Sequence, residues 1–213
     1  MKYIYTFCKL QRVQYVSHLD TLRVFERAMR RAKLPASYSQ GFHPHPLITF
    51  AQPLGVGISS EGELVEIAFE RPLTKEEQKR FQDSMPEGFA IKAYRENEKK
   101  SPFAALAQAV YDIRLNETLS KNQIEHFLDR NEILVMKHSK KGEKQVNIRP
   151  MIYGLQSIES EKPILRATLK AGQPSLKPEL LLQAMEQDIP DLRVQCNSIT
   201  RIGLLDEKGN PMV

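Results

Sequence analysis

The sequence predicts an α+β protein built from two tandem ferredoxin-like halves, each with the element order βαββαβ. Alternating strand-like and amphipathic helical segments follow one another in this order between residues 2 and 94. The same order recurs between residues 111 and 205, after the charged and almost apolar-free segment 95–100. We therefore expect two domains, residues 1–96 and 97–213.

The first half begins with a predicted strand over 2–10, in which Tyr3, Tyr5 and Phe7 share one face. Ser17 is a typical N-cap for a helix that ends near Lys33, before Pro35. The other predicted elements of this half are strands over 47–51 and 64–69, a helix over 74–85 and a strand over 89–94. In the second of these strands Glu66 is expected to point outward.

The second half repeats the pattern without repeating the residues. A short helix is predicted to start at Ser101-Pro102. The later elements are predicted as a strand over 111–115, a helix over 120–130, a hairpin of strands 133–138 and 145–152, a strand over 164–169, a helix over 177–187 and a strand over 194–205.

Composition excludes several classes of protein. The 213 residues are 41% hydrophobic and 27% charged, with 31 Lys and Arg against 26 Asp and Glu, which is typical of a globular, mildly basic protein. There is no run of 18 apolar residues and no signal-peptide pattern, so we expect a cytoplasmic protein. Cys8 and Cys196 cannot by themselves hold an iron–sulfur cluster or a Cys-rich zinc site. No phosphate-binding glycine loop or nucleophile motif is present, and we expect no resident cofactor or metal.

Positive charge is concentrated at the front of the chain. Residues 1–50 hold eight Lys and Arg against two Asp and Glu. Four arginines fall within about a third of the circumference of the first helix: Arg23, Arg27, Arg30 and Arg31. Such a stripe suits phosphate groups, because each guanidinium can donate two parallel hydrogen bonds. The alternative is a solvated face partly paired with Glu26 and neighbouring acids.

Three histidines are candidates for chemistry: His18, His43 and His45. Imidazole titrates near neutral pH, so His18 or His45 could serve as a general base in metal-independent RNA cleavage. A rigid loop held by prolines explains His43 and His45 equally well, and the spacing gives little support to a zinc site. Gln40 belongs to the same irregular segment.

Two further groups could contact RNA. Tyr3, Tyr5 and Phe7 could stack on bases if their sheet face were open, or could be buried by packing. Lys140, Lys141 and Lys144, at the tip of the predicted hairpin, could contact a phosphate backbone, or could form a solvated loop.

Six segments of the chain form recognisable motifs: Ser17-His18-Leu19-Asp20, the segment from Tyr38 to Pro46, Pro53-Leu54-Gly55-Val56, Val146-Asn147-Ile148-Arg149-Pro150, Lys177-Pro178-Glu179-Leu180-Leu181 and the segment from Thr200 to Leu205. In these motifs the chain resembles a bacterial family of unknown function, the radical SAM-associated family DUF2344. One common form of the second motif has Asn at the position of His43, whereas His45 matches. The resemblance implies a radical SAM enzyme as partner, because family members occur alone or joined to one.

The sequence therefore favours an accessory RNA-binding protein that acts with a radical SAM RNA-modifying enzyme and is not itself an enzyme. Its predicted RNA contacts are Arg23, Arg27, Arg30, Arg31, Gln40, His43, His45, Lys140, Lys141 and Lys144. One alternative is a metal-independent endoribonuclease, since the tandem ferredoxin-like plan is similar to that of the CRISPR repeat-processing endoribonucleases. The other is a protein-interaction subunit without RNA contact.

Overall fold

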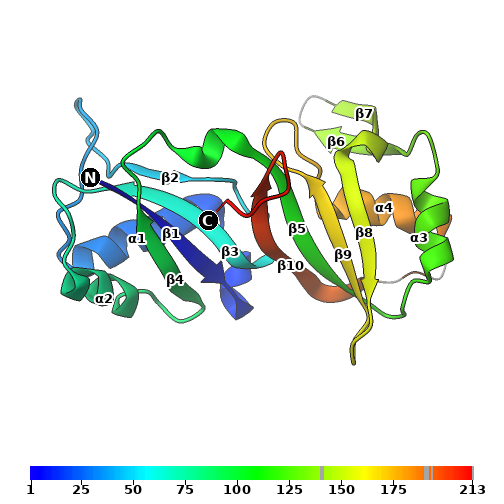
Figure 1. The fold of residues 1–213 in the computed structure, drawn as a ribbon, viewed down its shortest axis with the longest axis horizontal. Helices are drawn as coiled ribbons and strands as arrows, with labels where there is room; N and C mark the ends of the chain where they lie inside the picture. Colours follow the sequence, from blue (N-terminus) through cyan, green and yellow to red (C-terminus); the bar gives the residue numbers. More distant parts are fainter. Residues whose placement is uncertain (140–141, 190–191, 193, 213) are drawn as a thin grey trace. The chain divides into compact units, whose positions relative to one another are not determined.

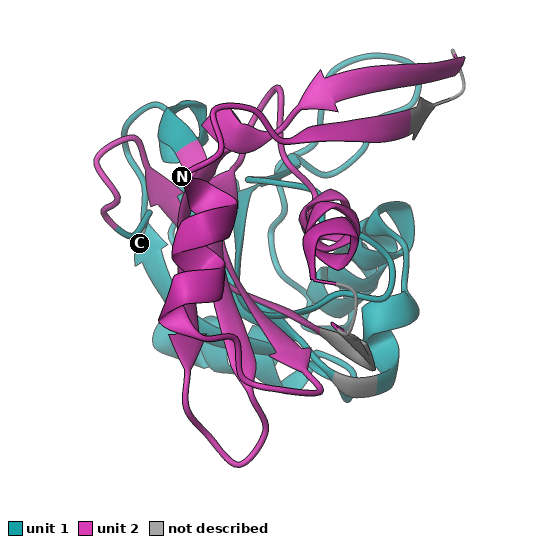
Figure 2. Cartoon of the chain, turned by 90° about the vertical axis from the view of Figure 1, so that its right-hand side faces the viewer, with its two compact units in different colours: residues 1–106, 211–213 teal, residues 107–210 magenta. Residues whose placement is uncertain are grey.

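The computed structural model describes residues 1–139, 142–189, 192 and 194–212. It is a mixed α+β protein, as the sequence predicts, and it contains a large sheet. The chain forms two compact units, coloured separately in Figure 2. Unit 1 consists of Met1–Leu106 with Pro211–Val213, and unit 2 of Ala107–Asn210.

In unit 1 the sheet has the strand order β4-β1-β3, and β2 pairs with β3 (Figure 1). The pairs β1–β3, β1–β4 and β2–β3 are all antiparallel. The elements are β1 (Lys2–Lys9), η1 (Gln11–Tyr15), α1 (His18–Arg31), β2 (Ile48–Phe50), β3 (Ser59–Ala68), α2 (Lys75–Asp83), β4 (Phe89–Glu96) and η2 (Pro102–Ala105).

The aromatic face of β1 is the floor of the unit 1 core. Phe7 meets Phe25 of α1 edge-on at a ring-centroid distance of 4.8 Å, and Tyr5 meets Phe81 of α2 at 5.2 Å. Tyr3, Tyr5 and Phe7 are each at most 1% exposed. Base stacking by these three residues is therefore excluded, because both helices cover this face of the sheet.

The other side of the same strands is also buried, which corrects the expectation that Glu66 points outward. Glu66 is 5% exposed and lies opposite Ile4 in the β1–β3 register. Its carboxylate accepts hydrogen bonds from Lys2 Nζ at 2.9 Å and Asn97 Nδ2 at 2.6 Å. A charged group in this position is tolerated because both carboxylate oxygens have partners.

The first turn of α1 is fixed by local contacts. Ser17 Oγ accepts a hydrogen bond from the Asp20 backbone N–H, as its predicted capping role requires. Just upstream, the buried Lys9 ammonium donates to the carbonyl oxygens of Gln14 and Val16. These bonds hold the chain that enters the helix against β1.

The C-terminal end of α1 is a Schellman turn. Lys33 N–H bonds to the Arg30 carbonyl and Leu34 N–H to the Met29 carbonyl. Lys33 has a φ of 53°, the left-handed conformation in which glycine is usual. At the point where α1 ends, Lys33 therefore adopts a left-handed backbone conformation that is unfavourable for a residue with a side chain.

Glu77 ties α2 to the loop that precedes it. It completes a capping box with Thr74 and accepts two hydrogen bonds from the Arg71 guanidinium, at 2.9 and 2.7 Å. Arg71, followed by the Thr74 backbone, lowers the pKa of Glu77 to about 2. The contacts of the folded protein therefore favour the ionised form of the Glu77 carboxyl.

In unit 2 the strand order is β10-β5-β9-β8, with a separate two-stranded hairpin, β6-β7. The elements are β5 (Leu106–Leu115), α3 (Lys121–Leu128), β6 (Leu134–Ser139), β7 (Gly142–Asn147), η3 (Arg149–Met151), β8 (Ile152–Ile158), β9 (Ile164–Lys170), α4 (Pro178–Asp188) and β10 (Val194–Asp206).

The predicted strand over 145–152 is wrong in its second part. β7 ends at Asn147, and a 3-10 turn containing Pro150 follows, because proline cannot donate to a strand ladder. β8 then pairs antiparallel with β9 and was not predicted. The predicted hairpin itself is present.

The core of unit 2 lies between its sheet and its helices. Buried residues alternate along β5, at Ala109, Tyr111, Ile113 and Leu115, and along β9. Phe127 of α3 and Met185 of α4 are fully buried. None of the described helices has the length and apolar character needed to cross a membrane.

Candidate nucleic-acid interface

The four arginines of α1 are all exposed, as the helical spacing predicts, but they differ in their partners. Arg23 Nη1 donates to Asp20 at 2.7 Å, one turn earlier on the helix. Arg31 Nη2 donates at 2.6 Å to the carbonyl oxygen of Ser84, the C-cap residue of α2. Two of the four guanidinium groups therefore already have protein acceptors.

Arg27 and Arg30 are different. Neither makes a hydrogen bond or ion pair with any residue that the structure describes. Both lie on the solvent side of α1, because Phe25, Ala28 and Met29 take the buried positions. These two guanidinium groups have all their donors available to a ligand.

Asp20 is the acid that pairs with the N-terminal arginine of this stripe. Hydrogen bonds from the Ser17 hydroxyl and from Arg23 lower the pKa of Asp20, and the charge of Arg27 acts in the same direction. Asp20 is therefore ionised at neutral pH and neutralises the N-terminal part of the stripe. Arg27 and Arg30, in the C-terminal part, form no ion pair with a described residue, although Glu26 lies one turn before Arg30 on the same helix.

The segment after α1 folds back on itself as a small hairpin. Tyr38 pairs with Pro46 as an isolated antiparallel bridge, and Ser39 N–H bonds to the His45 carbonyl at 2.9 Å. The Ser39 hydroxyl lies 2.9 Å from His45 Nδ1 and accepts the His45 backbone N–H at 3.1 Å. His45 is thus fixed by Ser39, which supports the interpretation of a rigid loop.

The tip of this hairpin points into solvent. Gln40, His43 and Pro44 are exposed, and Gly41 has a φ of 120°. Phe42 is 102% exposed, so its ring makes no contact that shields it from water. An aromatic ring displayed in this way beside a basic helix is not explained by packing.

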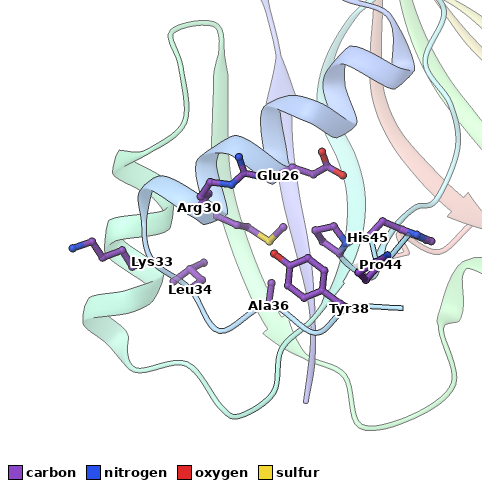
Figure 3. Close-up of a pocket in the computed structure, with 10 residues that line it drawn as sticks. Glu26, Arg30, Lys33, Leu34, Ala36, Tyr38, Pro44 and His45 are labelled. Atoms are coloured by element: carbon purple, nitrogen blue, oxygen red, sulfur yellow. The ribbon is translucent and has the colours of Figure 1, made fainter. Parts of the chain in front are cut away.

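A pocket of about 500 Å³ lies between α1 and this hairpin (Figure 3). Its walls come from the second half of α1 and from the hairpin stem. The lining residues are Glu26, Met29, Arg30, Lys33, Leu34, Ala36, Tyr38, Pro44, His45 and Pro46. In Figure 3 Glu26 and Arg30 lie along the helix and the Lys33 side chain extends away from the other labelled residues. Arg30 and His45, both singled out in the sequence, therefore line one cavity.

The histidines are not gathered into one site. His18, at the start of α1, meets Phe50 edge-on with ring centroids 5.2 Å apart and does not line the pocket. Arg30 is twelve positions further along the chain, about 18 Å along the helix. No hydrogen bond between described residues joins His18 to His43 or His45. Among the described residues, no group of three His, Cys, Asp or Glu is placed to hold a metal ion.

The hairpin of unit 2 holds the remaining predicted contacts. Lys144 is exposed on β7 and lies directly opposite Lys137 of β6. The pair concentrates positive charge on the β6-β7 hairpin, because two like charges that repel each other lie directly opposite. Lys140 and Lys141 lie outside the described residues.

Four residues of this surface were not predicted as contacts: Glu26, Lys33, Tyr38 and Phe42. The sequence indicates Glu26 only as a partner of the arginines. Tyr38 and Phe42 belong to the irregular segment 38–46, in which the predicted contacts are Gln40, His43 and His45. For Phe42 the sequence contains a signal of exposure, since an aromatic residue at the tip of a polar turn with glycine has little opportunity for burial.

Comparison with known proteins identifies a family of sequences. The family described as an uncharacterized protein conserved in bacteria (DUF2344) matches residues 2–178. This range contains the whole of α1, the hairpin and the pocket. No curated protein matches the chain.

Comparison with solved structures finds matches of low sequence identity and low TM-score. A chain in the crystal structure of a Cbf5-Nop10-Gar1 complex is 10% identical, with a TM-score of 0.48 over 93% of this chain and 47% of that one. A chain in the structure of an H/ACA RNP bound to a substrate RNA containing 2'-deoxyuridine is also 10% identical, with a TM-score of 0.45 over 92% and 46%. This chain spans about half the length of those chains, and TM-scores of this size assign no function.

Proposed function

We propose that this chain, which belongs to the DUF2344 family of uncharacterized conserved bacterial proteins, is an accessory RNA-binding protein that acts with a radical SAM RNA-modifying enzyme. The observation that carries the RNA part is the pair Arg27 and Arg30. Both are exposed and neither has a partner among the described residues. They lie beside a pocket and a hairpin that displays an aromatic ring.

Phosphate is the chemistry that this pair fits. A guanidinium presents planar N–H donors that bond two phosphate oxygens at once, and it keeps its charge at any physiological pH. Arg27 and Arg30 are three residues apart on one face of α1, so both can contact one strand. Contacts of this kind position nucleic acid and do not read its sequence.

The contact surface is a helix and its following hairpin rather than the face of the sheet. Tyr3, Tyr5 and Phe7 are closed off by α1 and α2, so they leave no base-stacking platform on the sheet. Phe42 presents a fully exposed aromatic ring on which a base can stack. The RNA path therefore runs along α1 and over the tip at residues 40–44.

Each unit has the plan of a ferredoxin-like domain. The strand order β4-β1-β3-β2 in unit 1 supports this, with two helices on one face. The order β10-β5-β9-β8 in unit 2 supports it as well, with β6-β7 as an insertion after α3. In this proposal the chain has two ferredoxin-like domains, and the boundary lies near the charged segment 95–100.

The radical SAM partner rests on the family resemblance. The chain has two cysteines, Cys8 and Cys196, and a radical SAM cluster needs three close together. Cys8 is buried in β1. The purified chain should therefore bind no iron–sulfur cluster under anaerobic reconstitution and should not cleave S-adenosylmethionine. An iron-loaded, S-adenosylmethionine-cleaving preparation of this chain alone would contradict the accessory role.

A charge-reversal experiment tests RNA binding. Arg27→Glu with Arg30→Glu should lower affinity for RNA at least tenfold, measured by fluorescence anisotropy in low salt. The matched control is Lys75→Glu with Lys92→Glu, which makes the same charge change at exposed positions of unit 1 away from α1. Equal losses in the two double variants would mean that RNA responds only to net charge, and the proposed surface would be wrong.

A further inference from the structure

The pocket between α1 and the hairpin contains one acid in a basic surface. Glu26 is half-buried, and like Arg30 it has no ion-pair or hydrogen-bond partner among the described residues. A Glu followed four residues later by Arg on a helix usually forms a surface pair. Here both groups line the cavity and are left for a ligand.

We infer that this pocket takes the base of an unpaired guanine nucleotide in the bound RNA, and that Glu26 selects it. The inference rests on the proposed function, because the surrounding arginines first have to bring a strand to the pocket. It goes beyond that function in assigning base specificity to a surface otherwise expected to read only phosphate.

The selection follows from hydrogen-bond chemistry. An ionised carboxylate offers only acceptors. Guanine presents two adjacent donors on its Watson–Crick edge, the N1–H and the N2 amino group, which match the two oxygens of Glu26. Adenine and cytosine each place a ring-nitrogen acceptor beside their amino group, and uracil places two carbonyls around its single N–H. In each of these three bases an acceptor atom would therefore face a carboxylate oxygen, and the two lone pairs would repel each other.

The walls of the pocket fit a planar base. Tyr38 is 50% exposed and lines the pocket beside Pro44 (Figure 3). Pro46 is another lining residue. Single-stranded RNA is read by this combination, in which an unstacked base lies against an aromatic or proline surface and bonds through its edge. A cavity of about 500 Å³ is within the usual range for a ligand of this size.

Arg30 supplies the counterpart to Glu26. Its donors complement guanine O6, which is adjacent to N1–H, or the phosphate of the same nucleotide. Adenine has an amino group at the position of O6, which would face these donors unfavourably. One acceptor group and one donor group, a single helical turn apart, therefore discriminate in the same direction.

The test uses single-stranded RNA 12-mers of adenosine with one central guanosine, inosine or adenosine. The parent should bind the guanosine strand about tenfold more tightly than the all-adenosine strand. Inosine lacks the N2 amino group and should fall between them. Glu26→Gln should reduce the guanosine preference to less than twofold without weakening binding of the all-adenosine strand.

The control is Glu61→Gln, which makes the same change at an exposed position of β3 and should leave the preference intact. Matching thermal unfolding curves show that both variants are folded. Equal binding of the guanosine and adenosine strands by the parent, or a preference that survives Glu26→Gln, would overturn this inference alone. Failure of the parent to bind any strand would overturn the proposed function, and this inference with it.

A last arm separates RNA from free nucleotide. Guanosine 5'-monophosphate should displace the guanosine strand only far above the dissociation constant of that strand, because it cannot occupy Arg27 and the hairpin tip at the same time. Displacement at or below that constant would assign the pocket to a free guanine nucleotide and contradict the RNA part of the inference.

Discussion

Arg23 and Arg30 lie on the same solvent face of α1, yet Arg23 is paired with Asp20 at 2.7 Å and Arg30 pairs with no residue in the described part of the chain. The stripe that looks uniform in the sequence is thus divided into an N-terminal part that is paired with Asp20 and a C-terminal part, Arg27 and Arg30, that forms no ion pair with a described residue.

Asp20→Asn should raise RNA affinity a few-fold. The change removes the acid that holds Arg23 and leaves a guanidinium free for phosphate. The matched control is Asp83→Asn, which breaks a comparable exposed pair with Lys79 on α2 and should leave RNA affinity unchanged. Titration of both variants with the same labelled RNA checks this. An unchanged or lower affinity in Asp20→Asn would show that Arg23 does not reach the RNA.

Lys33→Gly should make the protein more stable and a weaker RNA binder. Lys33 has a φ of 53°, and relieving a non-glycine residue in this conformation stabilises by about 1 kcal/mol. Removing its charge from the rim of the pocket should lower RNA affinity a few-fold. Denaturant unfolding and RNA titration measure the two effects. Lys33→Ala is the comparison, since it should lose the same affinity without the gain in stability.

Phe42→Ala should weaken RNA binding and leave stability unchanged. The ring is fully exposed, so no core contact is lost. Stacking of one base on an aromatic ring contributes about 1–3 kcal/mol, which corresponds to a loss of about 5- to 150-fold in affinity. Val56→Ala removes another exposed apolar side chain of unit 1 and should have no effect. An unaltered affinity in Phe42→Ala would show that the Phe42 ring does not contact the RNA.

Glu77→Gln should destabilise the protein at neutral pH but not at low pH. Arg71 and the Thr74 backbone lower the pKa of this carboxyl to about 2 from an ordinary value near 4.5. The stabilisation is complete above the ordinary value and is lost as the pH falls through about 2. Urea unfolding of parent and variant between pH 2 and pH 7 should show curves that converge toward the acid end. A constant difference across this range would contradict the assignment.

Local signals in the sequence were sufficient for the helices of unit 1. Ser17 caps α1 and Thr74 caps α2, and Pro35 follows the end of α1, because capping and chain termination depend on residues a few positions apart. The hairpin of unit 2 was found for the same reason.

Features that depend on distant residues were not predicted. Glu66 is buried because Lys2 and Asn97, 64 and 31 positions away, supply its partners. The Arg31 guanidinium donates a hydrogen bond to the Ser84 carbonyl, 53 positions away. β8 was missed because its burial pattern is irregular beside Gly154, and a strand recognised only through its pairing with β9 gives little periodic signal.

The most direct test of RNA binding through α1 is the salt dependence of affinity for parent and for Arg27→Gln with Arg30→Gln. Each phosphate contact on a single strand contributes about 0.7 to the slope of log affinity against log salt. If both arginines contact phosphate, the variant should lose about 1.4 from that slope, and Lys75→Gln with Lys92→Gln should lose nothing. An unchanged slope in the α1 variant would show that Arg27 and Arg30 do not bind the RNA backbone, and the account would be wrong.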